Sequence, residues 1–145
     1  MRGLLTALMI MAAAAVGRPA GAEDGRLPAD EALRRAEAGE LLIVDVRSPL
    51  EWRRTGLPAG AAPVTIHNSG GPEAFLREVE AAVGGDRDRP VALICASGVR
   101  SRAAQSFLAA RGFTHVYDIA EGMHGGRHGP GWMSRRLPTE PCTSC

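Results

Sequence analysis

The chain has 145 residues, in which 17 basic residues nearly balance 16 acidic ones, for a formal net charge of +1. A balance of this kind provides no excess of positive charge for phosphate backbones, so we expect no nucleic-acid partner. Every basic residue is an arginine, which excludes chemistry through a lysine Schiff base. The length suffices for one domain with its own core but not for two.

The N-terminus has the pattern of a secretory signal peptide. Arg2 precedes an apolar run at 4–16, and Ala20 and Ala22 are the small residues expected just before a cleavage point. The run is shorter than the roughly 20 residues that span a bilayer. We therefore expect residues 1–22 to be removed, the mature protein to be periplasmic or secreted, and no membrane contact to remain.

Apolar patterning beyond the leader predicts alternating helices and strands in one domain at 23–138, followed by a tail at 139–145. The predicted helices are Asp30–Ala38, Pro72–Val83 and Arg100–Gly112, the last with Ala103, Ala104, Phe107 and Leu108 on its apolar face. The predicted strands are Leu41–Val46, Val64–Ile66, Val91–Ile94 and His115–Ile119. This alternation favours an α/β fold with a parallel central sheet and helices on both faces.

Two charged residues follow the first predicted strand. Asp45 and Arg47 stand where that strand ends, and ligands of open α/β sheets gather outside the carboxyl ends of the strands. Asp45 is a candidate for orienting a neighbouring loop. Arg47 is a weaker candidate for the same task, because it also fits a local salt bridge with Glu51 that would hold the turn.

The most informative segment begins at Cys95, directly after an apolar strand and before a helix. The first turn of a helix and the loop before it point backbone N–H groups inward, which stabilises a thiolate. Arg100 adds a planar cation with donors that suit an oxyanion. The loop residues expected to surround the bound group are Ala96, Ser97, Gly98, Val99 and Ser101. We expect Cys95 to be a nucleophile, although free cysteines are often inert core residues.

The run from Cys95 to Ser101 resembles the active-site loop of the rhodanese family, in particular its single-domain sulfurtransferases. Leu42–Arg47 followed by Glu51-Trp52 resembles the family's early strand. Arg111–Tyr117, Glu121–Met123 and Gly131-Trp132 resemble its closing strand and glycine-rich turn. The resemblance covers Leu27–Pro138. One departure is the turn at 56–61, which lacks a histidine that the family often has there.

The resemblance implies a transfer of sulfane sulfur through a persulfide on Cys95, with ping-pong kinetics and without a metal or cofactor. It implies a thiosulfate-like donor, whose oxyanion Arg100 would hold, and a thiol or cyanide acceptor. A protein acceptor of unknown identity is also open. Backbone N–H groups of the loop would stabilise the negative persulfide, and Ser101 would cap the helix or hydrogen-bond the loop.

Two other functions remain open. A cysteine-dependent phosphatase or arsenate reductase would use the same thiolate and arginine, but related dual-specificity phosphatases have one more residue than the four between Cys95 and Arg100. A module that only binds or senses sulfur is the second alternative. The presence of both Cys95 and Arg100 argues against an inactive copy.

The tail carries two more cysteines, Cys142 and Cys145, which an oxidising compartment would join in a disulfide. A sharper hypothesis is that this pair accepts or resolves sulfur from Cys95 by thiol exchange. With His124 and His128 the pair could also be drawn as a zinc site, but glycines around the two histidines do not fix their rings. Hydrogen bonding or substrate entry is the favoured role of that loop.

Overall fold

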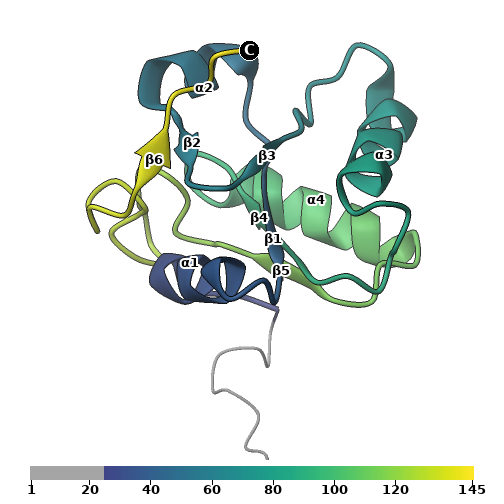
Figure 1. Cartoon of the computed structure of the whole chain (residues 1–145), viewed down its shortest axis with the longest axis horizontal. Helices are drawn as coiled ribbons and strands as arrows, with labels where there is room; N and C mark the ends of the chain where they lie inside the picture. The colour runs from purple at the N-terminus through teal and green to yellow at the C-terminus, as the bar shows by residue number, and fades with distance from the viewer. Residues whose placement is uncertain (1–24) are drawn as a thin grey trace, which may run out of the picture.

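The computed structural model describes residues 25–145 (Figure 1). The leader predicted over residues 1–22 lies outside the described residues. The helices are α1 (Ala29–Glu37), α2 (Pro49–Thr55), α3 (Gly71–Ala82) and α4 (Val99–Ala110). The strands are β1 (Leu42–Asp45), β2 (Leu57–Pro58), β3 (Ala62–Pro63), β4 (Val91–Ile94), β5 (Val116–Asp118) and β6 (Thr139–Glu140). Within the described part of the chain, no helix has the length and hydropathy that a membrane crossing requires.

The main sheet has four parallel strands in the order β3-β1-β4-β5, which confirms the predicted α/β class. Leu42 of β1 pairs with Val91 of β4, and Leu93 of β4 pairs with Asp118 of β5. Because all four strands run the same way, their carboxyl ends share one edge of the sheet. Asp45, Cys95 and Asp118 thereby come to that edge from three different strands.

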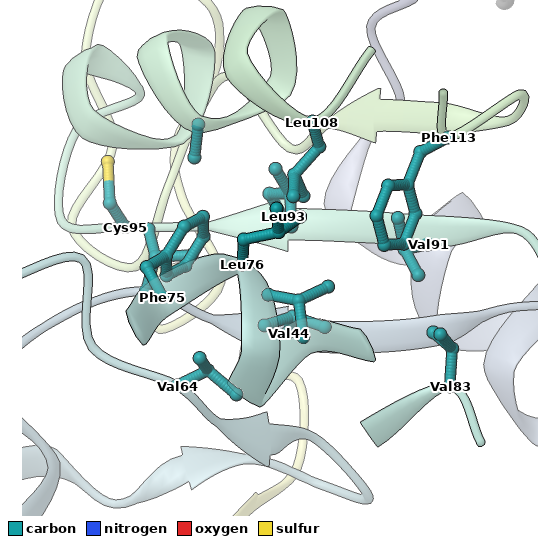
Figure 2. Close-up of a cluster of buried hydrophobic side chains, with 13 residues drawn as sticks. Val44, Val64, Phe75, Leu76, Val83, Val91, Leu93, Cys95, Leu108 and Phe113 are labelled. Carbon is teal, nitrogen blue, oxygen red and sulfur yellow. The ribbon is translucent and has the colours of Figure 1, made fainter. Parts of the chain in front are cut away.

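Helices cover both faces of the sheet, as predicted, because successive side chains of a strand point to opposite faces. Val44 and Leu93 belong to a core packed under α3 and α4, which Figure 2 shows as sticks. Ile43 and Ile94, their neighbours in sequence, belong to a second core under α1. The central strands are buried on both sides and consequently hold Cys95 rigidly at the end of β4.

The structure differs from the predictions at several elements. The weak strand expected at Val64–Ile66 begins earlier, at Ala62–Pro63, although Val64 and Ile66 still donate backbone hydrogen bonds to Asp45 and Val46. The helix α2 was not predicted. Ser48 and Glu51 form a capping box at its start, and Pro49 occupies its first turn.

The buried face of α4 also differs from the predicted one. Ala103 is exposed, whereas Gln105 is buried together with Ser101, Ala104 and Leu108. The Gln105 amide donates to the carbonyls of Gly25 and Val116, 2.9 Å from each, so its burial leaves no donor unpaired. A polar side chain can thus occupy a core position that hydrophobic spacing alone does not predict, provided that its hydrogen-bonding groups are satisfied.

A second, small sheet joins the tail to the domain. The antiparallel pair β2 and β6 aligns Leu57 with Glu140 and Pro58 with Thr139. The indole of Trp132, which is fully buried, donates to the Pro138 carbonyl at 3.0 Å and fixes the start of this segment. The C-terminus consequently lies beside α2 (Figure 1).

Candidate active site around Cys95

Cys95 is the residue that follows β4, and its side chain is 1% exposed. Figure 2 shows it at one end of the buried cluster, past the carboxyl end of the strand and beside α4. It is the free cysteine among the described residues. Burial alone would fit an inert core thiol, so the case for chemistry depends on the groups that face the sulfur.

Two polar groups, one of the loop and one of α4, face the Sγ atom of Cys95. The backbone N–H of Gly98 donates to the sulfur at 3.1 Å, and the hydroxyl of Ser101 lies 3.3 Å from it. Both residues belong to the start of α4, where the helix has its positive end. The arrangement suits a negative sulfur atom.

The segment after β5 supports the loop from outside. The backbone N–H groups of Met123 and His124 donate to the carbonyls of Cys95 and Ala96, both at 2.9 Å. These hydrogen bonds satisfy the two carbonyl groups on the outer side of the loop. The loop is therefore held in one conformation by a part of the chain 28 residues away in sequence.

Arg100 binds Glu51, the carboxylate that the sequence analysis paired with Arg47. Its Nη2 and Nη1 atoms donate to Glu51 of α2 at 2.7 and 2.9 Å, and Nη1 lies 3.5 Å from Nε2 of His67. The hydrogen bond from Arg100 holds the pKa of Glu51 well below its usual range, and Glu51 in turn raises the pKa of Arg100. Arg100 thus remains a cation beside the loop, with two of its nitrogens engaged by Glu51.

The salt bridge expected between Arg47 and Glu51 is wrong. Arg47 is fully buried and pairs with Asp45, its Nη2 lying 2.6 Å from Oδ2 of that residue. It also donates to Thr55 and to the Gly56 carbonyl, both at 2.8 Å. Because Asp45 and Arg47 satisfy each other, they fix the turn that leads from β1 through α2 to β2.

In the sequence Glu121 is notable only as part of the segment that resembles the family motif. In the structure it holds neighbouring backbone segments in place. Its carboxylate is 2% exposed and accepts from the backbone of Ala29 and Gly131, both at 2.8 Å, and from Arg135. Burial opposes the charge, but Arg135 and the two N–H groups lower the pKa of Glu121 overall. The signal available in the sequence was a charged residue directly before Gly122, at the start of the glycine-rich segment.

The tail cysteines are joined to each other. Cys142 and Cys145 form a disulfide, and the Cys145 carbonyl accepts from Arg53 of α2. The zinc alternative is therefore wrong, because the sulfurs are bonded to each other. Among residues 25–145, no three or more His, Cys, Asp or Glu side chains are grouped so that they could hold a metal ion. His124 and His128 are exposed.

The comparisons with known proteins agree with the fold. A family model described as rhodanese-like domain matches residues 28–128. The thiosulfate sulfurtransferase GlpE of Glaesserella parasuis is 32% identical over 101 residues, covering 70% of this chain and 79% of the relative. GlpE of Pseudomonas syringae is 31% identical over 97 residues, covering 67% and 81%.

Solved structures show the same fold. The rhodanese-like domain of an Anabaena protein superposes with a TM-score of 0.62 at 21% identity, covering 82% of this chain and 80% of that one. The polysulfide-sulfur transferase of Wolinella succinogenes gives 0.61 at 23% identity with the same coverage. A Rhodopseudomonas palustris protein titled a possible tyrosine phosphatase gives 0.57 at 26% identity, covering 79% and 83%. The family model spans most of the chain, and the chain belongs to the rhodanese-like domain family.

Proposed function

We propose that the protein is a sulfurtransferase that carries sulfane sulfur as a persulfide on Cys95. The observation that carries this proposal is the Cys95 sulfur itself, which faces the Gly98 N–H and the Ser101 hydroxyl at the positive end of α4. A thiolate in this position is a nucleophile whose charge is already compensated. The two GlpE relatives, named thiosulfate sulfurtransferases, support thiosulfate as a donor.

The first half-reaction is an attack by the Cys95 thiolate on the outer sulfur of thiosulfate. A sulfur–sulfur bond forms to Cys95, the bond inside thiosulfate breaks, and sulfite leaves with its electron pair. In the second half-reaction cyanide or a thiolate attacks the outer persulfide sulfur and the Cys95 thiolate leaves. No electrons are gained or lost overall, and no proton is required.

The geometry assigns Arg100 a narrower role than direct capture of an oxyanion through all its donors. Two of its nitrogens already bind Glu51, so its positive charge, at the edge of the loop, attracts the anionic donor while Glu51 holds the side chain in place. Because Cys95 is 1% exposed, a small donor such as thiosulfate reaches the sulfur more readily than a large one. The backbone N–H of Gly98 then stabilises the persulfide charge.

The loop length favours this reaction over phosphate chemistry. Ala96, Ser97, Gly98 and Val99 are the four residues between Cys95 and Arg100. This cradle is one residue shorter than that of the dual-specificity phosphatases, and a sulfur atom needs less room than a phosphoryl group. Because the chain also resembles the Rhodopseudomonas palustris protein described as a possible tyrosine phosphatase, an aryl phosphate is the alternative substrate to test.

The test is the intact mass of the protein after brief thiosulfate treatment and then after cyanide. We expect a gain of one sulfur atom that cyanide removes and that thiosulfate restores over repeated cycles. Cys95→Ser should gain none, whereas the matched double variant Cys142→Ser and Cys145→Ser should load like the wild type. A wild type that gains no sulfur, or that hydrolyses an aryl phosphate instead, would overturn the proposal.

We also propose export to the periplasm or beyond, on the pattern of residues 1–22 and on the tail disulfide, which suits an oxidising compartment. Expression of the full chain followed by mass measurement of the periplasmic fraction tests this. A species that begins at Glu23 is the expected result. Retention of the full-length mass in the cytoplasm would contradict it.

A further inference from the structure

A groove lies between α3 and α4, and the reaction above assigns nothing to it. Its volume is about 190 Å³. Both helices pack over the core that contains Cys95, on the same face of the main sheet (Figure 2). The lining side chains are all apolar and come from α3, from α4 and from the segment after β3, namely Ile66, Pro72, Phe75, Ala103, Ala104 and Phe107.

Two small residues of α4 leave this space open. The side chains of Ala103 and Ala104 end at Cβ, and they line the groove together with Phe75 of α3. Ala104 is fully buried, whereas Ala103 is exposed. A larger side chain at Ala103 would therefore fill the groove without entering the core.

A pair of aromatic rings forms one wall of the groove. The ring centroids of Phe75 and Phe107 lie 6.1 Å apart, with the ring planes inclined by 51°. Phe75 is buried and Phe107 is half-buried, so part of the second ring remains accessible. The Arg111 guanidinium lies 4.6 Å from the Phe107 centroid and pairs with Glu73 of α3 at 2.6 Å. This ion pair joins the two helices and bounds the groove beside Phe107.

The other end of the groove meets Arg100. Arg100 precedes Ala103 by three residues, so the two side chains lie on the same side of α4. Ile66, which lines the groove, is followed by His67, whose Nε2 atom lies 3.5 Å from Nη1 of Arg100. A cation consequently stands at the end of the groove that is nearer the start of α4.

The groove also lies against the cluster that holds the nucleophile. Phe75 and Ala104 line the groove and belong to the same buried cluster as Cys95. Figure 2 shows Phe75 and Cys95 at the same end of that cluster. A molecule in the groove therefore has one end near the cysteine loop.

Size and charge together select the kind of molecule that fits. Two of the five N–H groups of Arg100 go to Glu51, so others remain for an anion. An apolar cavity of about 150 Å³ binds benzene, so a groove of about 190 Å³ admits one aromatic ring. The tilted pair of phenylalanine rings favours an aromatic occupant in particular. Thiosulfate satisfies the cation but leaves the groove empty.

We propose that the groove binds the aryl group of an aromatic thiosulfonate donor, Ar–SO₂–S⁻, while Arg100 holds its sulfonyl oxygens. The Cys95 thiolate attacks the outer sulfur of this donor. A sulfur–sulfur bond forms to Cys95, the bond from the outer sulfur to the sulfonyl sulfur breaks, and the aryl sulfinate leaves with the electron pair. No electrons are gained or lost overall, and no proton is required. The inference rests on the proposed sulfurtransferase function and names a donor class for it.

Benzenesulfonate tests the groove without any chemistry, because it has the ring and the sulfonyl oxygens but no transferable sulfur. It is titrated into the purified protein while NMR follows the methyl signals of Ile66, Ala103 and Ala104. We expect these signals to shift and to saturate. Methanesulfonate, which has the same charge and no ring, should leave them unchanged at the same concentrations. No saturating shift with benzenesulfonate, or equal shifts with both anions, would overturn the proposal.

A matched pair of variants locates the binding. Ala103→Leu fills the groove, so benzenesulfonate should no longer shift the signals of Ile66 and Ala104. Ala110→Leu makes the same change at an exposed alanine of α4 outside the groove and should bind like the wild type. Undiminished binding by Ala103→Leu would contradict the location. Circular dichroism checks folding, and if Ala103→Leu is unfolded, the comparison of the two sulfonates on the wild type decides.

Steady-state kinetics test the donor class. The quantity measured is the ratio of kcat/KM with benzenethiosulfonate to kcat/KM with thiosulfate. We expect Ala103→Leu to lower this ratio at least about tenfold, the usual effect of a changed carbon group in an apolar pocket. Ala110→Leu should keep the wild-type ratio. The same ratio in all three proteins would overturn the assignment of the donor.

Binding of benzenesulfonate involves no sulfur transfer, so the two proposals fail separately. Saturable binding in the groove without sulfur loading from either donor would overturn the sulfurtransferase and leave a site for aryl sulfonates. Sulfur loading from thiosulfate without binding in the groove would overturn the groove and leave the sulfurtransferase.

Discussion

Gly98 sets the position of the donor that faces the nucleophile. Its φ angle is +91°, a conformation that L side chains rarely adopt, and a Cβ atom there would lie 2.1 Å from the Ala120 carbonyl oxygen. This close approach joins the cysteine loop to the segment after β5. The glycine is thus required both by the left-handed backbone and by the neighbouring main chain.

We expect Gly98→Ala to lower the free energy of unfolding by about 1–3 kcal/mol from backbone strain, with a further loss from the collision with Ala120. It should also slow sulfur loading on Cys95, because the Gly98 N–H moves away from the sulfur. Gly84→Ala is the matched control, since Gly84 also has a positive φ of 69° but has no atom within 4 Å of a built Cβ. Urea unfolding and mass measurement of the two variants check this. Equal losses in both would show that the contact with Ala120 contributes nothing.

The link between α2 and α4 is the contact that fixes Arg100 at the mouth of the loop. Glu51 caps the start of α2 through Ser48 and binds Arg100 in the first turn of α4 with both carboxylate oxygens. Their side chains are 28% and 26% exposed, so solvent screens the pair and its contribution to stability is about 1 kcal/mol or less. Its main effect is on orientation.

We expect Glu51→Gln to be less stable than the wild type at neutral pH and to approach it in acid. The folded state lowers the pKa of Glu51 below the ordinary 4.5, so the contribution is present above that value and is lost as the pH falls below it. Urea unfolding of both proteins as a function of pH measures the difference. Glu73→Gln, which removes an exposed partner of Arg111 away from the loop, is the control variant for these unfolding measurements. A stability difference that grows in acid would contradict the assignment.

The tail is attached to the whole molecule by few contacts. The two residue pairs of β2 and β6, and the bond from Arg53 to the Cys145 carbonyl, hold it against the domain. The disulfide between Cys142 and Cys145 closes a very short loop and contacts neither core cluster. Opening of such a segment costs far less free energy than global unfolding.

We expect replacement of Cys142 and Cys145 by serine to leave the global melting temperature nearly unchanged and to speed proteolysis near the C-terminus. The thiol relay is a separate prediction: with a dithiol acceptor the double variant should turn over more slowly than the wild type, and with cyanide at the same rate. Melting curves, limited proteolysis and the two acceptor assays check these outcomes. Equal rates with both acceptors would remove the tail from the reaction.

Sequence periodicity located most elements within one or two residues, but it failed where tertiary contacts override it. Gln105 is buried because two distant carbonyls accept its amide hydrogens, and nothing in the spacing of α4 announces those carbonyls. The helix α2 could have been predicted from its capping box, Ser48 to Glu51, because that signal is local. The strand β6 has only two residues and exists through its pairing with β2, so no local pattern marks it.

The sequence by itself determined the fold class, the position of Cys95 between a strand and a helix, and the four-residue spacing to Arg100, because each depends on neighbours along the chain. Only the tertiary structure decided the charge partners. Glu51 binds Arg100 and not Arg47, and Glu121 accepts from the backbone of Ala29 and Gly131. These pairings arise from strand order and helix placement, which bring together residues that are far apart in sequence.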